Sequence, residues 1–366
     1  MFVPSVKSKF SLIALSVIAI ALFIWVNGSR VFVKQKYYNK KLKAANLMKK
    51  AEDEAKQYLI SKGKTIDKVN DPYYSYLIGE KNTIITTDRG NLNAKLTSLN
   101  SNVAAVVLEL MKRAKLKKGD EVVVNLTASY PALNIAIYSA AKVLGIKLIP
   151  ISSVGSSMFG MTDPNFTWLD LESYLYEKKI FPYKSVAASI GGGRDLGRGL
   201  TSNGRKAIID AINRNDVLLV KENSLEENIL EKMKIFEKNA TKPKLYINVG
   251  GGLSSLGNSI NGKLVSTGYH SYLNLKNIPL KGTMFLFADK KVPVIHILNV
   301  LGFAQKYKLP IVPDEMPTPG EGVTFLEPRY NTTYAAISLF ILVVFIGIII
   351  IYDHSQMKLK HDEVND

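Results

Sequence analysis

Two long apolar runs, one near each end, constrain this chain more than any other feature. No charged residue occurs at positions 10–29 or at positions 334–352. A helix rising about 1.5 Å per residue needs about 20 residues to cross the roughly 30 Å apolar core of a bilayer, where its backbone must satisfy its own hydrogen bonds. Both runs are therefore predicted to be transmembrane helices.

Aromatic residues support this prediction. Trp25 lies near the end of the first run, and Tyr334 and Tyr352 bracket the second, as is typical of a membrane interface. The alternative for the first run is a cleaved signal peptide, with residues 26–28 as a small-residue cleavage site. The run is longer than the apolar region of most signal peptides, which favours an uncleaved anchor.

Basic residues give opposing indications about orientation. Lysines precede the first run and follow the second, which favours a cytoplasmic N-terminal segment, 1–9, and a cytoplasmic tail, 353–366. A second basic cluster on the inner side of the first run favours the reverse: Arg30, Lys34, Lys36, Lys40, Lys41 and Lys43. The N-terminus resembles a signal anchor, and long domains cross membranes despite their charge, so we expect a two-pass protein of the cell membrane whose body is extracytoplasmic.

Charge and composition restrict what the rest of the chain can bind. The net charge is +17, and residues 51–352 contain 36 Lys and Arg against 27 Asp and Glu. This surplus favours a polyanionic partner, although a solvated basic surface explains it equally well. Cysteine is absent, which excludes disulfides, thiol nucleophiles and cysteine-ligated zinc, and with only four histidines no metal site is expected.

The region between the runs divides by composition. Residues 37–62 lack proline and glycine, so segment 30–70 is predicted to be a basic helical stalk that continues the anchor. An α/β body is predicted at 71–312, its first thirty residues irregular. The proline- and glycine-rich segment 313–333 is predicted to link the body to the second membrane helix.

Within the body, short apolar strands alternate with amphipathic helices. Strands are predicted at 121–126, 146–151, 185–190, 217–221, 244–249 and 283–288, and helices at 103–115, 131–144, 202–213, 225–239 and 297–307. This order is typical of a mostly parallel sheet with helices on both faces. The predicted fold is therefore a Rossmann-like three-layer α/β sheet, flanked by the two transmembrane helices.

Small polar residues follow four of the predicted strands. Ligands in such folds bind beyond the carboxyl ends of the strands, where glycines admit a close ligand and helix N-termini favour anions. Arginines there can bind a carboxylate or phosphate through two hydrogen bonds. The predicted ligand-binding residues are Thr127, Ser129, Ser152, Ser153, Ser156, Gly191, Gly192, Gly193, Arg194, Arg198, Asn248, Gly250, Gly251 and Gly252.

The alternative is that these segments are ordinary tight turns that require positive φ. None of them matches a phosphate-binding loop, so the sequence gives no support for nucleotide binding and leaves the cofactor unknown.

Candidates for catalysis are few. Ser129 and Asp195 are the candidate catalytic residues, but Ser129 lacks the glycines of a nucleophile elbow and is more typical of a helix cap before Pro131. Further acids or bases are Asp163, Asp170 and Glu222. His296 lies in an apolar run and is predicted to be buried.

Five segments together resemble the poly-gamma-glutamate system protein (PgsW-like) family. They are residues 127–136, 151–157, 167–170, 191–199 and 247–253, and the resemblance extends from the predicted stalk to the second membrane helix. It implies a membrane protein associated with the bacterial machinery that makes and exports poly-gamma-glutamate, a capsule polymer rich in carboxylates. It implies no settled activity.

Three hypotheses of function follow. The first is a membrane-anchored accessory protein that binds poly-gamma-glutamate or the synthase or export subunits, with no nucleic acid partner. The alternative is a hydrolase or transferase acting on gamma-glutamyl amide bonds through Ser129, Asp195 and Arg194. The third is a scaffold in which the membrane helices alone carry the function.

Overall fold

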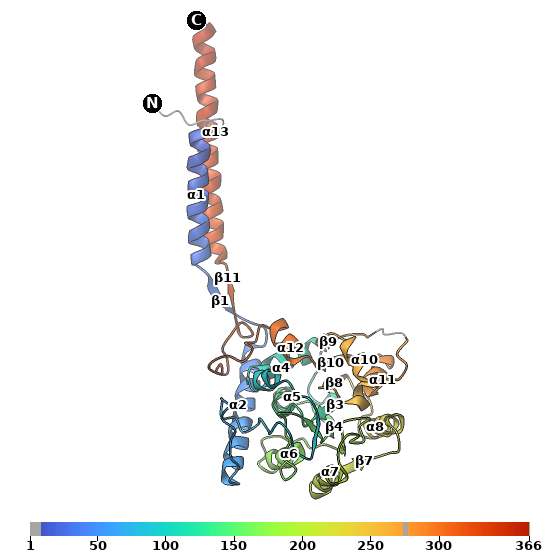
Figure 1. Cartoon of the computed structure of the whole chain (residues 1–366). Helices are drawn as coiled ribbons and strands as arrows, with labels where there is room; N and C mark the ends of the chain where they lie inside the picture. The colour runs from blue at the N-terminus through green and yellow to red at the C-terminus, as the bar shows by residue number, and fades with distance from the viewer. Residues whose placement is uncertain (1–8, 274–276, 366) are drawn as a thin grey trace. The chain divides into compact units, whose positions relative to one another are not determined.

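The computed structural model describes residues 9–273 and 277–365, and the chain divides into two compact units. One unit, which we call the body, is Lys36–Phe325. The other, the terminal unit, combines Met1–Gln35 with Leu326–Asp366. Each is described by itself below (Figure 1).

The terminal unit contains two helices that are long and apolar enough to cross a membrane. They are α1 (Lys9–Gly28) and the part of α13 (Thr332–Asn365) from Thr332 to Ser355, and the two helices pack together. Next to them, β1 (Val31–Lys34) pairs antiparallel with β11 (Leu326–Arg329). The rings of Trp25 and Tyr334 stack with their centroids 4.9 Å apart. Helices α1 and α13 and strands β1 and β11 thus pair with each other within this unit.

The segment predicted to be a linker contains strand β11, and the predicted tail is helical, because α13 continues as far as Asn365. One expectation about the flanking segments was wrong. The stalk is not a continuation of the anchor, because β1 separates α1 from α2 (Tyr38–Ser61). Short strands with every residue exposed, such as β1, carry little apolar periodicity, so the sequence did not reveal them.

Helix α2 belongs to the body. Its apolar residues recur every three or four positions and are buried: Ala44, Met48, Ala51, Ala55 and Leu59. This stripe packs against α4 (Val103–Arg113) and α5 (Pro131–Leu144). Three of these residues are alanines and one is an unbranched methionine, so the backbones of the packed helices can approach closely. Helix α2 is therefore a layer of the core and not a stalk.

A seven-stranded sheet forms the centre of the body, with the order β7-β6-β4-β3-β8-β10-β9. The strands are β3 (Glu121–Thr127), β4 (Lys147–Ser153), β6 (Ala187–Ser189), β7 (Leu218–Val220), β8 (Leu245–Val249), β9 (Gly268–His270) and β10 (Val294–Ile297). Every pairing is parallel except that of β9 with β10 at one edge. The predicted mostly parallel α/β sheet is confirmed.

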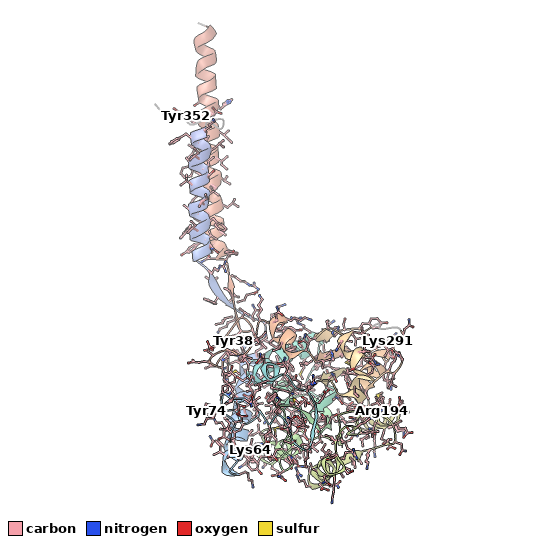
Figure 2. The ribbon with its side chains drawn as sticks, in the orientation of Figure 1. Tyr38, Lys64, Tyr74, Arg194, Lys291 and Tyr352 are labelled. Carbon is pink, nitrogen blue, oxygen red and sulfur yellow. The ribbon has the colours of Figure 1, made fainter. Side chains whose placement is uncertain are left out.

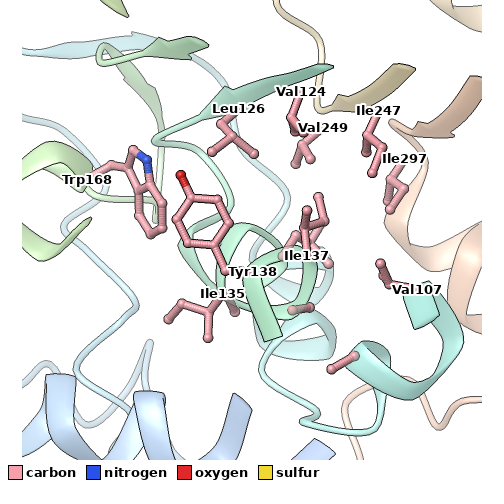
Figure 3. Close-up of a cluster of buried hydrophobic side chains, with 14 of the residues drawn as sticks. Val107, Val124, Leu126, Ile135, Ile137, Tyr138, Trp168, Ile247, Val249 and Ile297 are labelled. Carbon is pink, nitrogen blue, oxygen red and sulfur yellow. The ribbon is translucent and has the colours of Figure 1, made fainter. Parts of the chain in front are cut away.

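Helices cover both faces of this sheet (Figure 1). Val122, Val124 and Leu126 of β3 join a core built with α4, α5, α6 (Trp168–Glu177) and α7 (Ser202–Arg214). In Figure 3, Tyr138 and Trp168 lie beside Leu126 within this core. Val123 faces the opposite core, built with α8 (Leu225–Asn239), α9 (Leu253–Leu256) and α11 (Thr283–Asp289). Because neighbouring residues of β3 face both cores, the strand is buried on its two sides.

Turn chemistry explains where several helices begin and end. Pro131 opens α5, where its missing N–H is of no consequence, and Gly145 ends the helix with φ at 69°. Thr167 and Asp170 form a reciprocal capping box at the start of α6. Helix α5 is therefore the whole helical connection between β3 and β4.

Two further elements were predicted wrongly. Residues 283–288, predicted as a strand, form helix α11, because a short apolar run has no periodicity that separates the two structures. The helix predicted at 297–307 is shorter, α12 (Val300–Lys306), and is preceded by β10. The irregular region before α4 contains α3 (Leu92–Ser98) and β2 (Thr86–Asp88), which pairs with β5 (Ser156–Ser157). The short α10 (Ser259–Lys263) completes the described elements.

Candidate functional site

The four glycine- and serine-rich turns lie along one edge of the sheet. They follow β3, β4, β6 and β8, which are parallel neighbours, so their carboxyl ends share the same side. The close packing of the turns is direct: a Cβ on Gly250 would lie 2.8 Å from Thr127 Cγ2, and one on Gly191 would lie 3.1 Å from Ser153 Cβ. Glycine at these positions permits the turns to meet. We call this region the carboxyl edge.

The order of the strands reverses at the centre of this edge. From β3 the chain moves outward through β4, β6 and β7, and then returns to place β8 on the other side of β3. Across this junction Asn125 of β3 is paired in register with Asn248 of β8. Neither amide atom of Asn125 hydrogen-bonds a described residue, although the side chain is fully buried. An unsatisfied buried amide is unusual and indicates a place for a polar ligand or water.

His296 continues this polar row onto β10. It is paired with Asn248 in register, and its Nδ1 lies 3.1 Å from Asn248 Nδ2 while its Nε2 lies 3.1 Å from the Gly262 carbonyl oxygen. Burial lowers the pKa of His296 to about 4, against a smaller opposing effect of the Gly262 carbonyl. The imidazole is therefore neutral, with its proton on Nε2, and its predicted burial is confirmed.

Asp195 is inside the protein and not at its rim. Its carboxylate accepts a hydrogen bond from Ser189 Oγ at 2.9 Å, and its Oδ2 lies 2.8 Å from Nζ of Lys232 on α8. Lys232 also donates to Ser189 Oγ at 2.8 Å and to Ser254 Oγ at 2.6 Å. Both charged side chains are buried, so this ion pair, which we call the Lys232 cluster, anchors the loop after β6.

A second buried lysine lies at the same edge. Lys95 of α3 donates from Nζ to the Ser129 carbonyl oxygen at 2.5 Å and to Ser157 Oγ at 2.8 Å. Its Nζ also lies 3.8 Å from the centre of the Tyr130 ring. The N–H of Ser157 in turn donates to Ser129 Oγ at 3.0 Å. We call these four residues the Lys95 cluster.

The Lys95 cluster differs from the Lys232 cluster in its charges. Lys95 forms no ion pair in the part of the chain that the structure describes, and only 2% of the residue is exposed. Burial lowers its pKa to about 7. Burial also raises the pKa of Tyr130 to about 12, so the phenol is neutral. The lysine is thus able to gain or lose a proton near neutral pH.

Several predicted site residues have structural partners instead. Ser152 faces the core containing α6, where its hydroxyl accepts from Trp168 Nε1 at 3.2 Å and shares a 2.7 Å hydrogen bond with Ser185. Its assignment to the ligand site is therefore wrong. The predicted cap role of Ser129 is also wrong, because Tyr130 occupies the cap position and the Ser129 hydroxyl accepts from Ser157. Ser156 is buried and donates to the Ala128 carbonyl oxygen.

Arg194 and Arg198 are exposed on the loop after β6. Arg194 has a left-handed φ of 55°, and the side chains of both arginines form no hydrogen bond or ion pair with the described residues. Figure 2 shows Arg194 at the periphery of the body. The Lys232 cluster fixes the backbone between them through Asp195. The loop therefore presents two free guanidinium groups on a fixed base.

The acids at the start of α6 have capping roles. Asp170 accepts from Arg214 Nε at 2.7 Å and from its Nη2 at 2.6 Å, and these hydrogen bonds and those from Asn215 and Thr167 lower its pKa despite burial. Asp163 and Asp170 line a pocket of about 530 Å³ together with Tyr58, Tyr174 and Arg214. The residues of this pocket belong to none of the four turns. Glu222 is exposed on a loop.

Sequence reasoning missed Lys95, Ser157 and Lys232. A signal existed for Lys232, because it lies among buried positions 225, 229, 233 and 236 on one face of α8. Lys95 offered none, because α3 has seven residues and five consecutive ones are buried. Only contacts across 34 and 62 positions of sequence identify its role.

Within residues 9–273 and 277–365, no group of three His, Asp or Glu side chains is arranged to hold a metal ion. Comparisons of the chain with family models, with curated proteins and with solved structures each found no match.

Proposed function

We propose that this chain is a two-pass protein of the cell membrane whose extracytoplasmic body binds a carboxylate-rich polymer, poly-gamma-glutamate, during its synthesis or export. The observation that supports this most directly is the pair of free arginines, Arg194 and Arg198, on the fixed loop at the carboxyl edge. The guanidinium group matches a carboxylate through two parallel hydrogen bonds. A polymer with a carboxylate on every residue could bind both arginines.

The arrangement of the sheet also supports a binding site at the carboxyl edge. We propose that the fold is Rossmann-like in the sense that matters for binding: the strand order reverses between β3 and β8, and ligands collect outside such a junction. The unsatisfied amide of Asn125 lies at that junction. A polar group of the ligand, or a water that contacts it, would satisfy this side chain.

Salt dependence of binding provides the test. The full chain in detergent micelles should bind poly-gamma-glutamate, and the affinity should fall steeply as salt rises, because the contacts are exposed charge pairs. Arg194→Gln with Arg198→Gln should weaken binding at least about tenfold, which corresponds to about 1.4 kcal/mol. Glutamine keeps the Cβ that the left-handed backbone at Arg194 already tolerates.

The matched control removes two charges from the opposite edge. Lys244 precedes β8, and Lys291 precedes β10 and has φ of 60°, so Lys244→Gln with Lys291→Gln repeats the charge and backbone of the test variant. This control should bind the polymer like the unchanged chain. Equal losses of affinity in the two variants, or equal affinity for RNA of the same length, would mean that binding is a nonspecific effect of net charge.

The orientation of the body is tested separately. Protease added to intact cells from which the outer layers have been stripped should digest the body and leave both membrane helices protected. A body that is cut only after the membrane is permeabilised would place it in the cytoplasm and would exclude contact with exported polymer.

A further inference from the structure

Lys95 and Ser157 have the geometry of a serine and its base. The Nζ of Lys95 lies 2.8 Å from Ser157 Oγ, and the lysine is buried while Ser157 is partly exposed. The three partners of Nζ are the Ser129 carbonyl, the Tyr130 ring and the Ser157 hydroxyl. In a neutral amine the two N–H groups can serve the carbonyl and the ring. The lone pair then remains for the proton of Ser157.

We infer that Ser157 is a nucleophile and Lys95 its general base, in a site that cleaves or transfers an acyl group held in an amide bond. Serine and lysine pairs of this kind perform acyl transfer on unrelated folds, because a serine hydroxyl is a weak nucleophile until a neighbouring base removes its proton. This assignment replaces Ser129 as the candidate nucleophile. It also gives the enzyme hypothesis a base within hydrogen-bond distance of its nucleophile.

Ser129 has a positioning role in the same site. Its hydroxyl accepts the N–H of Ser157, and its carbonyl accepts from Lys95. These two contacts fix the nucleophile and the base with respect to each other. Pairing of β5 with β2 fixes Ser157 from the other side. The pair is thus held by backbone from three separate segments.

The chemistry balances without a cofactor. As Ser157 Oγ bonds to the amide carbon, its proton passes to Lys95 Nζ. The C–N bond then breaks, and Lys95 returns that proton to the departing amine, which leaves an ester on Ser157. A water molecule gives a proton to Lys95 while its oxygen bonds to the ester carbon, and the proton returns to Ser157 as the ester bond breaks. An amine in place of water makes the reaction a transfer.

The substrate class rests on the proposed function. The turn after β4 contacts the loop after β6, since a Cβ on Gly155 would lie 2.7 Å from the Ile190 carbonyl oxygen. A substrate for this edge would therefore carry a carboxylate for Arg194 and Arg198 on the neighbouring loop as well as an amide carbonyl for Ser157. A gamma-glutamyl amide has this composition: an amide carbonyl and a free carboxylate on one residue.

The surroundings of Lys95 permit it to act near neutral pH. Tyr130 is a titratable side chain that faces it, and this phenol is neutral because burial raises its pKa to about 12. Helix α12 packs against α3, and its Lys306 donates to the Thr267 carbonyl oxygen at 2.7 Å. With the pKa of Lys95 at about 7, a large fraction of this lysine is neutral at physiological pH.

A fluorophosphonate probe tests the pair without a known substrate. This reagent forms a covalent bond with activated serines, and peptide mapping should place it on Ser157 of the full chain in micelles. Ser157→Ala should abolish the labelling, whereas Ser202→Ala, at an exposed position at the start of α7, should leave the label on Ser157. The rate should rise about tenfold per pH unit up to about pH 7 and then level off, since only neutral Lys95 can accept the proton.

Variants of Lys95 separate a base from a structural cation. Lys95→Met should slow labelling by at least about 100-fold. Lys95→Arg should be as slow, because a guanidinium group does not give up its proton, whereas a purely structural cation would be restored by arginine. Should either variant unfold, the pH profile of the unchanged chain decides. Absence of label on Ser157, or a rate that does not change through pH 7, overturns the proposal.

Two readouts on the unchanged chain distinguish this proposal from the one on which its substrate rests. Label on Ser157 without binding of the polymer overturns the proposed function and leaves the serine and lysine pair standing. Binding of the polymer without label on Ser157 overturns the pair alone. Cleavage of gamma-glutamyl 4-nitroanilide by the unchanged chain, lost in Ser157→Ala and in Arg194→Gln with Arg198→Gln, would support both proposals together.

Discussion

Two buried lysines lie at the same edge of the sheet, and their surroundings differ in charge. Each places Nζ against three groups of the protein. For Lys232 these are two serine hydroxyls and the carboxylate of Asp195, whereas for Lys95 they are a carbonyl, a hydroxyl and an aromatic ring. The difference is therefore a single negative charge.

This difference separates stability from chemistry. A buried cation paired with a carboxylate holds two segments together, and removal of one partner leaves the other charged and unsolvated. For a buried cation without a carboxylate, desolvation favours the neutral form, and burial lowers the pKa of Lys95 to about 7. We therefore expect the Lys232 cluster to control folding of the edge and the Lys95 cluster to control what the edge does.

The largest expected effect is that of breaking the paired cluster. Lys232→Met leaves the Asp195 carboxylate buried without a cation, which should destabilise the body by about 3–5 kcal/mol. Urea unfolding followed by the fluorescence of buried Trp168 measures this change. Lys234→Ala on the same helix, whose lysine is 74% exposed, is the control and should change stability by less than about 1 kcal/mol. Similar losses in the two variants would contradict the comparison.

The next largest effect concerns the Ser189 hydroxyl, which hydrogen-bonds both charged side chains of the Lys232 cluster. Ser189 Oγ donates to Asp195 and accepts from Lys232, so Ser189→Ala should cost about 1.5–3 kcal/mol, the range for hydrogen bonds to charged groups. The same unfolding experiment measures it. Ser202→Ala, at an exposed position at the start of α7, is the control. A loss below that of the control would mean that the ion pair does not need this hydroxyl.

Lys95, which has no carboxylate partner among the described residues, should make the stability of the body depend on pH. Its pKa is about 7 in the folded protein and about 10.4 in an unfolded chain, so between these values the unfolded state binds more protons. Stability should then increase with pH, by at most about 1.4 kcal/mol per unit, and the penalty present below pH 7 should vanish above about pH 10. Unfolding between about pH 7 and pH 9 measures the slope, which Lys95→Met should remove.

The smallest expected effect is that of the proposed nucleophile. Ser157→Ala removes one hydrogen bond at a partly exposed position, so it should cost only about 0.5–1.5 kcal/mol. Thermal unfolding of the two proteins measures the difference. A loss as large as that from Lys232→Met would show that the Lys95 cluster is a structural centre as well.

Much of the architecture could be predicted from local patterns. The strands that became β3, β4 and β8 are apolar runs bounded by turns, and the helices between them have clear amphipathic periods, so alternation and a parallel sheet followed. Elements without such a period were missed: β1 is exposed throughout, and α11 is too short for a helix to be told from a strand. Helix α2 was recognised as a helix, but its alanine stripe was not read as a buried surface.

The candidate site divides in the same way. Parallel strands all end at the same edge of a sheet, so the polar turns that follow them were expected to lie together. The carboxyl edge could therefore be located from the sequence. Ser152 was misplaced because successive residues of a strand face opposite sides, and it belongs with the core of α6. Lys95 lies in a short helix and carries no pattern, and nothing in the serine-rich turn after β4 distinguishes Ser157 from its neighbours.

For this protein, hydropathy and periodicity alone determined the two apolar helices and the alternating sheet, because both depend on neighbours within a few residues. Only the tertiary structure decided the strand order, and with it which lysine meets a carboxylate and which meets a serine. Those partners come from distant segments, and the charge of a buried amine depends on the groups that replace its water.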